Sequence, residues 1–187
     1  MSDRVTIREA VASVEGQLGT ITTLVNNAGM PDAQWAVKQS DELIDTVMGT
    51  NLTGPYILSC EVARKLMQEK LPGRMVNIAS MAAFHTTAQS AAPLYSITKK
   101  ALVRMTETLA VEWAGRNINV NAIAPGFFSS EMTDGMLERI GDITPTLNRK
   151  RIPTAEQMDS TLLFLLSPSS ECVTGTCIKI DDGQMAR

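Results

Sequence analysis

The sequence predicts an α/β fold, a Rossmann-like parallel sheet with helices on both faces, because short apolar runs alternate with longer helical patterns. β-branched and apolar residues fill these runs, as is typical of strands buried on both faces. Strands separated by helices form right-handed βαβ units, so the strands should run parallel. The four runs are TITTLVNN (20–27), RMVNIAS (74–80), NINVNAIAP (117–125) and CIKIDDG (177–183).

Helices are predicted between these runs. The first has apolar residues at helical spacing and ends before Gly19. Residues 127–152 mix Gly, Pro and Met and are expected to form a mobile loop with short helices. With 187 residues, of which 44% are hydrophobic, residues 1–187 are predicted to form a single domain. The predicted helices span residues 4–18, about 40–49, 51–70, about 93–115 and 154–167.

Composition argues against several classes of function. The net charge is −3 and no basic stripe is present, which argues against nucleic acid as a partner. No apolar run is long enough to span a bilayer and no signal-peptide pattern is visible, so no membrane partner is expected. Cys60, Cys172, Cys177 and the single His85 lack the spacing of metal ligands, so we expect no metal and three reduced thiols in a cytoplasmic protein.

Polar and glycine residues gather where the predicted strands end. In parallel sheets the carboxyl ends of the strands meet at one edge, and ligands bind there. The residues at this edge are Asn26–Gly29, Ser80 and Pro125–Gly126. Taken singly, each has an ordinary structural explanation, since Asn and Gly suit turns and Asn51, at the start of its predicted helix, would suit a cap.

Tyr95 and Lys99 are four residues apart, so a helix places them on one face. An ammonium beside a phenol favours the phenolate and would lower the tyrosine pKa from its ordinary value near 10. Such a tyrosine could donate and accept protons at neutral pH. The pair arises by chance in many helices, but Ser80 ends the preceding strand and could hold a substrate carbonyl oxygen beside the tyrosine.

The order and spacing of these motifs resemble the short-chain dehydrogenase/reductase family, in particular its 3-oxoacyl-ACP reductase-like members. The motifs are NNAG (26–29), Asn51, Ser80, Tyr95-x-x-x-Lys99 and Pro125-Gly126, and the resemblance covers essentially the whole chain. It implies an oxidoreductase that transfers hydride between NAD or NADP and a small-molecule carbonyl or secondary alcohol substrate. It also implies a homodimer or homotetramer.

The resemblance further implies four catalytic residues. Tyr95 would be the general acid in reduction and the general base in oxidation. Lys99 would lower the tyrosine pKa and bind the nicotinamide ribose. Ser80 would orient the substrate carbonyl, and Asn51 would hold a water in the proton relay that ends at Lys99.

It also implies a set of cofactor-binding residues. Besides Tyr95 and Lys99, these are Asn27, Ala28 and Gly29 against the adenosine ribose, Pro125, Gly126 and Phe128 along the nicotinamide, and Ser130 at its carboxamide. Residues 127–152, called the lid segment below, are expected to cover the substrate.

Two departures from the family pattern stand out. Tyr95 follows Ser80 by 15 residues, slightly more than is usual, and the extra residues fall in the loop FHTTAQSAAP, where His85 is expected at the pocket rim. The family's opening strand and Gly-rich TGxxxGxG turn are not found in the sequence. We therefore expect an N-terminally truncated form, or a piece of a longer chain, with strand 20–27 at an exposed edge. The alternative is a catalytically inactive module that associates with itself or a partner.

Overall fold

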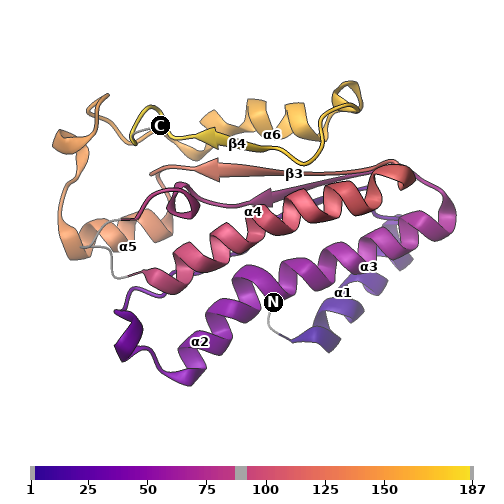
Figure 1. Cartoon of the computed structure of the whole chain (residues 1–187), viewed down its shortest axis with the longest axis horizontal. Helices are drawn as coiled ribbons and strands as arrows, with labels where there is room; N and C mark the ends of the chain where they lie inside the picture. Colours follow the sequence, from indigo (N-terminus) through magenta and orange to yellow (C-terminus); the bar gives the residue numbers. More distant parts are fainter. Residues whose placement is uncertain (1–2, 87–91, 186–187) are drawn as a thin grey trace.

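The computed structural model describes residues 3–86 and 92–185, and its four strands form one sheet in the order β1-β2-β3-β4 (Figure 1). Every neighbouring pair is parallel. The predicted α/β class and all four predicted strands are confirmed, although β1 and β4 are shorter than the sequence suggested. The strands span Thr23–Asn26 (β1), Gly73–Ile78 (β2), Ile118–Pro125 (β3) and Cys177–Ile180 (β4).

The helices occupy the segments that periodicity predicted. Asp3 caps the first helix by accepting a hydrogen bond from the Val5 amide at 2.9 Å, and Gly19 ends it with a positive φ of 84°. The lid segment holds one ten-residue helix, and a short 3-10 turn at Ala155–Met158 precedes the last helix. The α-helices are Arg4–Leu18 (α1), Asp41–Met48 (α2), Gly54–Glu69 (α3), Pro93–Trp113 (α4), Glu131–Ile140 (α5) and Asp159–Leu166 (α6).

The sheet lies between two helical layers, as the alternation of its side chains requires (Figure 1). On one face Met75 and Val120 pack with the buried side of α3 and α4, including Leu66 and Leu102. On the other face Val76, Ile123 and Leu165 form a separate cluster, against which Leu162 and Leu166 of α6 also pack. The strands therefore carry apolar residues on both faces.

The segment around Asn51 corrects the prediction that this residue opens a helix. Residues 41–69 are helical throughout, and Gly49–Thr53 form a π-helical turn between α2 and α3. The Gly54 amide bonds back to the Gly49 carbonyl, five residues earlier. Pro55 has no N–H to donate to the Asn51 carbonyl in the α-helical pattern, which explains why the helix widens at this turn. Such turns recur at functional sites.

β1 lies at an edge of the sheet, because within the described ranges it pairs with β2 alone. This position agrees with the expected exposed edge. No helix in residues 3–86 and 92–185 is long and apolar enough to cross a membrane.

Candidate active site

The structure brings Gly29, Asn51 and Lys99 together at the carboxyl edge of the sheet. Lys99 comes from the first turns of α4 and donates a hydrogen bond to the Ile78 carbonyl, at the end of β2, at 2.7 Å. A Cβ on Gly29 would lie 3.1 Å from the Lys99 Nζ and 3.6 Å from the Asn51 Oδ1. The bare backbone of NNAG is therefore needed for this close approach.

Asn51 is fully buried, and its side chain joins two parts of the site. Its Oδ1 accepts from the Met30 amide and its Nδ2 donates to the Met30 carbonyl, both at 2.9 Å. Nδ2 also lies 3.2 Å from the Thr98 hydroxyl, which donates to the Tyr95 carbonyl at 2.9 Å. The π turn thus aims Asn51 at both the strand-end segment and the tyrosine helix.

Tyr95 and Lys99 lie together as predicted, with the Lys99 Nζ 5.6 Å from the centre of the tyrosine ring. Burial lowers the pKa of Lys99 to about 8, because the ammonium loses water. The predicted lowering of the Tyr95 pKa is wrong for this arrangement. Burial raises the pKa of Tyr95, and a hydrogen-bonding interaction with Ser80 opposes that rise only in part.

Ser80 follows β2 and caps the short 3-10 turn Met81–Ala83, with its hydroxyl oxygen accepting from the Ala82 amide at 3.1 Å. This contact fixes the serine side chain, whose hydroxyl interacts with Tyr95 and opposes the rise in its pKa. His85 is exposed at the end of this turn. Part of the loop that lengthens the Ser80–Tyr95 interval, residues 87–91, lies outside the described residues.

The residues expected on the cofactor side differ in exposure. Asn27 and Ala28 are exposed, so their surfaces are free to meet a ligand. Phe128 is buried. Ser130 caps α5, and its oxygen accepts from the Thr133 amide at 3.2 Å, so its hydroxyl already has a structural partner.

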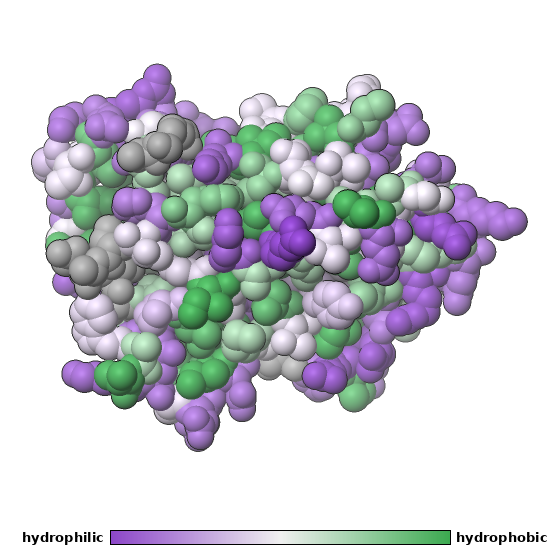
Figure 2. Space-filling model, viewed as in Figure 1, coloured by the Kyte–Doolittle hydropathy of each residue, from purple (hydrophilic) through white to green (hydrophobic). Residues whose placement is uncertain are grey.

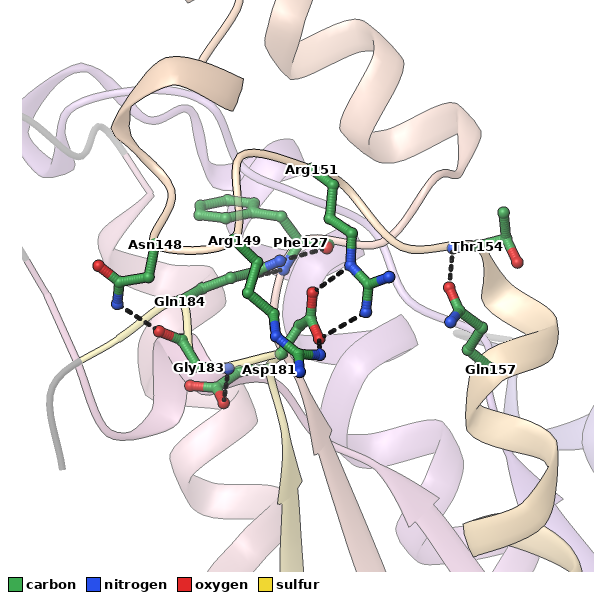
Figure 3. Close-up of polar contacts among 10 residues, drawn as sticks. Phe127, Asn148, Arg149, Arg151, Thr154, Gln157, Asp181, Gly183 and Gln184 are labelled. Carbon is green, nitrogen blue, oxygen red and sulfur yellow. Dashed lines mark hydrogen bonds and ion pairs between the residues drawn. The ribbon is translucent and has the colours of Figure 1, made fainter.

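The turn after β3 is held by the end of the chain. Gln184 accepts from the Phe127 amide at 2.7 Å and donates to the Phe127 carbonyl at 2.9 Å, a contact visible in Figure 3. The Gly126 amide bonds the Ile180 carbonyl at 2.8 Å. Residues 180–184 therefore fix the backbone from Gly126 to Phe127, next to Phe128.

The lid segment is attached to the same C-terminal turn (Figure 3). Arg151 binds the Asp182 carboxylate through two nitrogens, at 2.7 and 2.9 Å, and Arg149 adds a third contact at 2.6 Å. These bonds hold the pKa of Asp182 well below its usual range. The sequence does not predict Asp182 or Gln184 as site residues, because nothing in a run such as DDGQ shows which distant residues it will meet.

Comparison with known proteins identifies the family. A family model described as enoyl-(acyl carrier protein) reductase matches residues 1–185. The chain belongs to the short-chain dehydrogenase/reductase family. It is 34% identical over 184 residues to 2-dehydro-3-deoxy-D-gluconate 5-dehydrogenase of Dickeya dadantii, covering 97% of this chain and 70% of that protein. It is also 34% identical to 3-oxoacyl-[acyl-carrier-protein] reductase FabG of Thermotoga maritima, covering 98% and 74%.

Solved structures of this oxidoreductase family have the same fold. A short-chain type dehydrogenase/reductase from Mycobacterium marinum superposes with a TM-score of 0.93 at 27% identity, covering 100% of this chain and 73% of that one. 4-Hydroxyisoleucine dehydrogenase complexed with NADH is also similar, with a TM-score of 0.86 and 27% identity, covering 100% of this chain and 78% of that one. F189W actinorhodin polyketide ketoreductase with NADPH has a TM-score of 0.91 and 28% identity, covering 98% of this chain and 74% of that one. NAD and NADP are thus both represented among its structural relatives.

The residues at the sheet edge fit the nicotinamide half of such a cofactor. The Lys99 ammonium has three donors, and the Ile78 carbonyl takes one of them. The remaining donors suit ribose hydroxyls. Gly29 has no side chain to crowd this ammonium.

Proposed function

We propose that this chain, as a single domain, transfers hydride between NAD or NADP and a small-molecule carbonyl or secondary alcohol, with Tyr95 as general acid and base. The observation that carries the proposal is the half-buried Tyr95 phenol, which interacts with the Ser80 hydroxyl and has the Lys99 ammonium 5.6 Å from its ring centre. The relatives named as dehydrogenases and reductases support the same reaction class.

When bound, the nicotinamide supplies the hydride to the carbonyl carbon. Ser80 donates a hydrogen bond to the carbonyl oxygen and orients it toward Tyr95. Tyr95 gives its phenolic proton to that oxygen, and its raised pKa keeps it protonated at neutral pH, as reduction requires. In the direction of oxidation Tyr95 must first lose this proton, and the resulting phenolate then takes the alcohol proton.

Lys99 and Asn51 replace the proton that Tyr95 gives up. With a pKa of about 8, Lys99 is mostly an ammonium at pH 7 yet can release a proton at modest cost. Asn51 is held by Met30 and Thr98, which fixes its amide for holding a water beside Lys99. Asn27–Gly29 line the adenosine ribose in this proposal, and Pro125, Gly126, Phe128 and Ser130 line the nicotinamide.

The test is hydride transfer followed by absorbance at the reduced nicotinamide band. The chain is mixed with NADH or NADPH and a panel of keto acids, 3-oxoacyl thioesters and sugar-derived ketones. Tyr95→Phe should remove at least about 99% of turnover, since it deletes the proton donor. Tyr56→Phe, the other tyrosine of the chain, is the matched control and should retain activity. Equal rates for Tyr95→Phe and the parent would refute the proposal.

A second candidate is a non-catalytic module that associates with itself or with a relative. The edge position of β1 favours it, because an unpaired strand edge can accept another strand. A calorimetric titration with NADH and NADPH separates the two. Binding with a Kd below about 1 mM, corresponding to about −4 kcal/mol, supports the enzyme. If the chain forms stable oligomers but binds neither NADH nor NADPH, the result supports the non-catalytic module.

We also propose a homodimer or homotetramer in which α3 and α4 meet a second copy. Apolar surface gathers over the region of α2, α3 and α4 in Figure 2. Tyr56 on α3 and Ile97 and Val111 on α4 are among the exposed large hydrophobic residues. Sedimentation velocity tests this proposal. Val111→Glu should shift the chain toward monomer, and an unchanged distribution would contradict this interface.

A further inference from the structure

The helix that carries Tyr95 has no cap of its own. Ala92 occupies its N-cap position and offers no side-chain acceptor, although the first amides of a helix need partners outside it. The Leu94 amide instead donates to the Asp32 carboxylate at 2.8 Å. Asp32 lies 62 residues earlier, in the segment that follows NNAG. Its negative charge suits the positive end of the helix dipole.

Asp32 is 3% exposed, which is uncommon for an aspartate. One of its oxygens accepts both from Leu94 and from the Gln39 side chain, at 2.8 and 2.5 Å. The other oxygen is buried and has no hydrogen-bond partner among the described residues. Burial of a carboxylate oxygen that lacks a partner among residues 3–86 and 92–185 has a cost in stability.

The surroundings of Asp32 connect it to the site. Two residues before it, Met30 is bound on both its amide and its carbonyl by Asn51. Asn51 contacts Thr98, which lies one turn along α4 from Leu94. These contacts close a ring from Asp32 through α4 and Asn51 back to Met30. Tyr95 lies inside that ring, directly after the residue that Asp32 binds.

We propose that Asp32 is a positioning residue for Tyr95: by binding the Leu94 amide, it fixes the start of α4 against the strand-end segment 29–32. The position of the phenol relative to the Gly29 backbone, which faces Lys99, is then fixed. The proposal rests on the function proposed for Tyr95. A displacement of about 1 Å at such a group can lower turnover about 100-fold.

The test uses the two tyrosines of the chain. In a Tyr56→Phe background the only phenolate absorbance comes from Tyr95, so its titration can be followed without cofactor. Asp32→Ala should speed amide hydrogen exchange at Leu94 and Tyr95 by about tenfold or more, because a bond to a charged acceptor is lost. It should also move the pKa of Tyr95 down toward its ordinary value, because the ring gains water.

Three further variants separate positioning from simple capping. Asp3→Ala removes an aspartate cap from α1 and should change neither readout. Asp32→Asn keeps a carbonyl acceptor and should retain most of the exchange protection. Asp32→Ala combined with Ala92→Ser restores a local cap to α4, and should slow exchange again while the Tyr95 titration stays shifted.

The proposal is overturned if Asp32→Ala leaves the Tyr95 titration unchanged, or if Ala92→Ser restores both readouts. It is also overturned if Asp3→Ala shifts the Tyr95 titration equally. Neither readout needs turnover, so an inactive parent chain would refute the proposed function while leaving this test intact. In a chain that turns over, Asp32→Ala should lower kcat by about tenfold or more and change KM by less than about threefold.

Discussion

Replacing Lys99 with methionine should stabilise the fold while removing activity. Lys99 is 3% exposed, and its pKa falls from the ordinary 10.5 to about 8 because burial disfavours the ammonium. At pH 7 the folded chain carries this charge at a cost of roughly 3 kcal/mol relative to the unfolded chain, since each tenfold change in proton affinity is worth about 1.4 kcal/mol.

Methionine is similar in length and has no charge to bury, but it leaves the Ile78 carbonyl without its donor. That loss costs about 1–2 kcal/mol. Lys99→Met should therefore be more stable than the parent by roughly 1–2 kcal/mol at pH 7. Urea unfolding followed by tryptophan fluorescence measures the difference.

The pH dependence makes this prediction specific. Between pH 8 and 10.5 the unfolded chain still holds the proton that folded Lys99 has released, so the free energy of unfolding of the parent rises with pH. The advantage of Lys99→Met should therefore shrink by about 2 kcal/mol from pH 7 to pH 9.5. Lys100→Met, at an exposed position on the same helix, is the control and should show no such change. A Lys99→Met variant that is less stable at pH 7, or whose difference is the same at both pH values, would refute this account.

Two further predictions concern the C-terminal turn. Gly126→Ala should lower the free energy of unfolding by about 1–3 kcal/mol, because its Cβ would clash with the Gln184 Oε1 and lie 2.8 Å from the Asp181 Cβ. As a control, the Cβ of Gly16→Ala in α1 meets no atom within 4 Å, so this variant should raise the free energy of unfolding by up to about 1 kcal/mol. Equal effects of the two variants in urea unfolding would contradict the packing argument. Asp182→Asn should speed proteolysis of the lid segment at pH 7, because it removes the charge that Arg149 and Arg151 bind. Because the pKa of Asp182 is depressed, its contribution to stability is present above the ordinary aspartate pKa near 4 and is lost as pH falls below that value. The thermal midpoints of variant and parent should therefore converge only in strong acid.

The pattern of apolar residues was sufficient to predict the fold class. Each strand has apolar side chains on both faces, and the longer helices have apolar residues at helical spacing, so the local sequence already encodes which element forms. The boundaries of β1 and β4 were less predictable, because a strand ends where its neighbour stops pairing. That depends on a segment elsewhere in the chain.

The Tyr95 and Lys99 pairing was also readable, because a helix brings residues four apart together whatever else surrounds it. The protonation behaviour of the pair was not readable. The sequence suggested that a nearby ammonium would lower the tyrosine pKa, but Lys99 is buried and Tyr95 is half-buried, and loss of water has the larger effect. Burial depends on the packing of the whole site.

The order of the elements, the polar residues at the strand ends and the spacing of the tyrosine and lysine are all readable from the sequence, because they follow from neighbours along the chain. That Asp32 caps α4 and that Asp182 binds the lid segment could be learned only from the folded structure. Each of these depends on a backbone group or a side chain far away in sequence, and the partner becomes identifiable only when folding brings the two together.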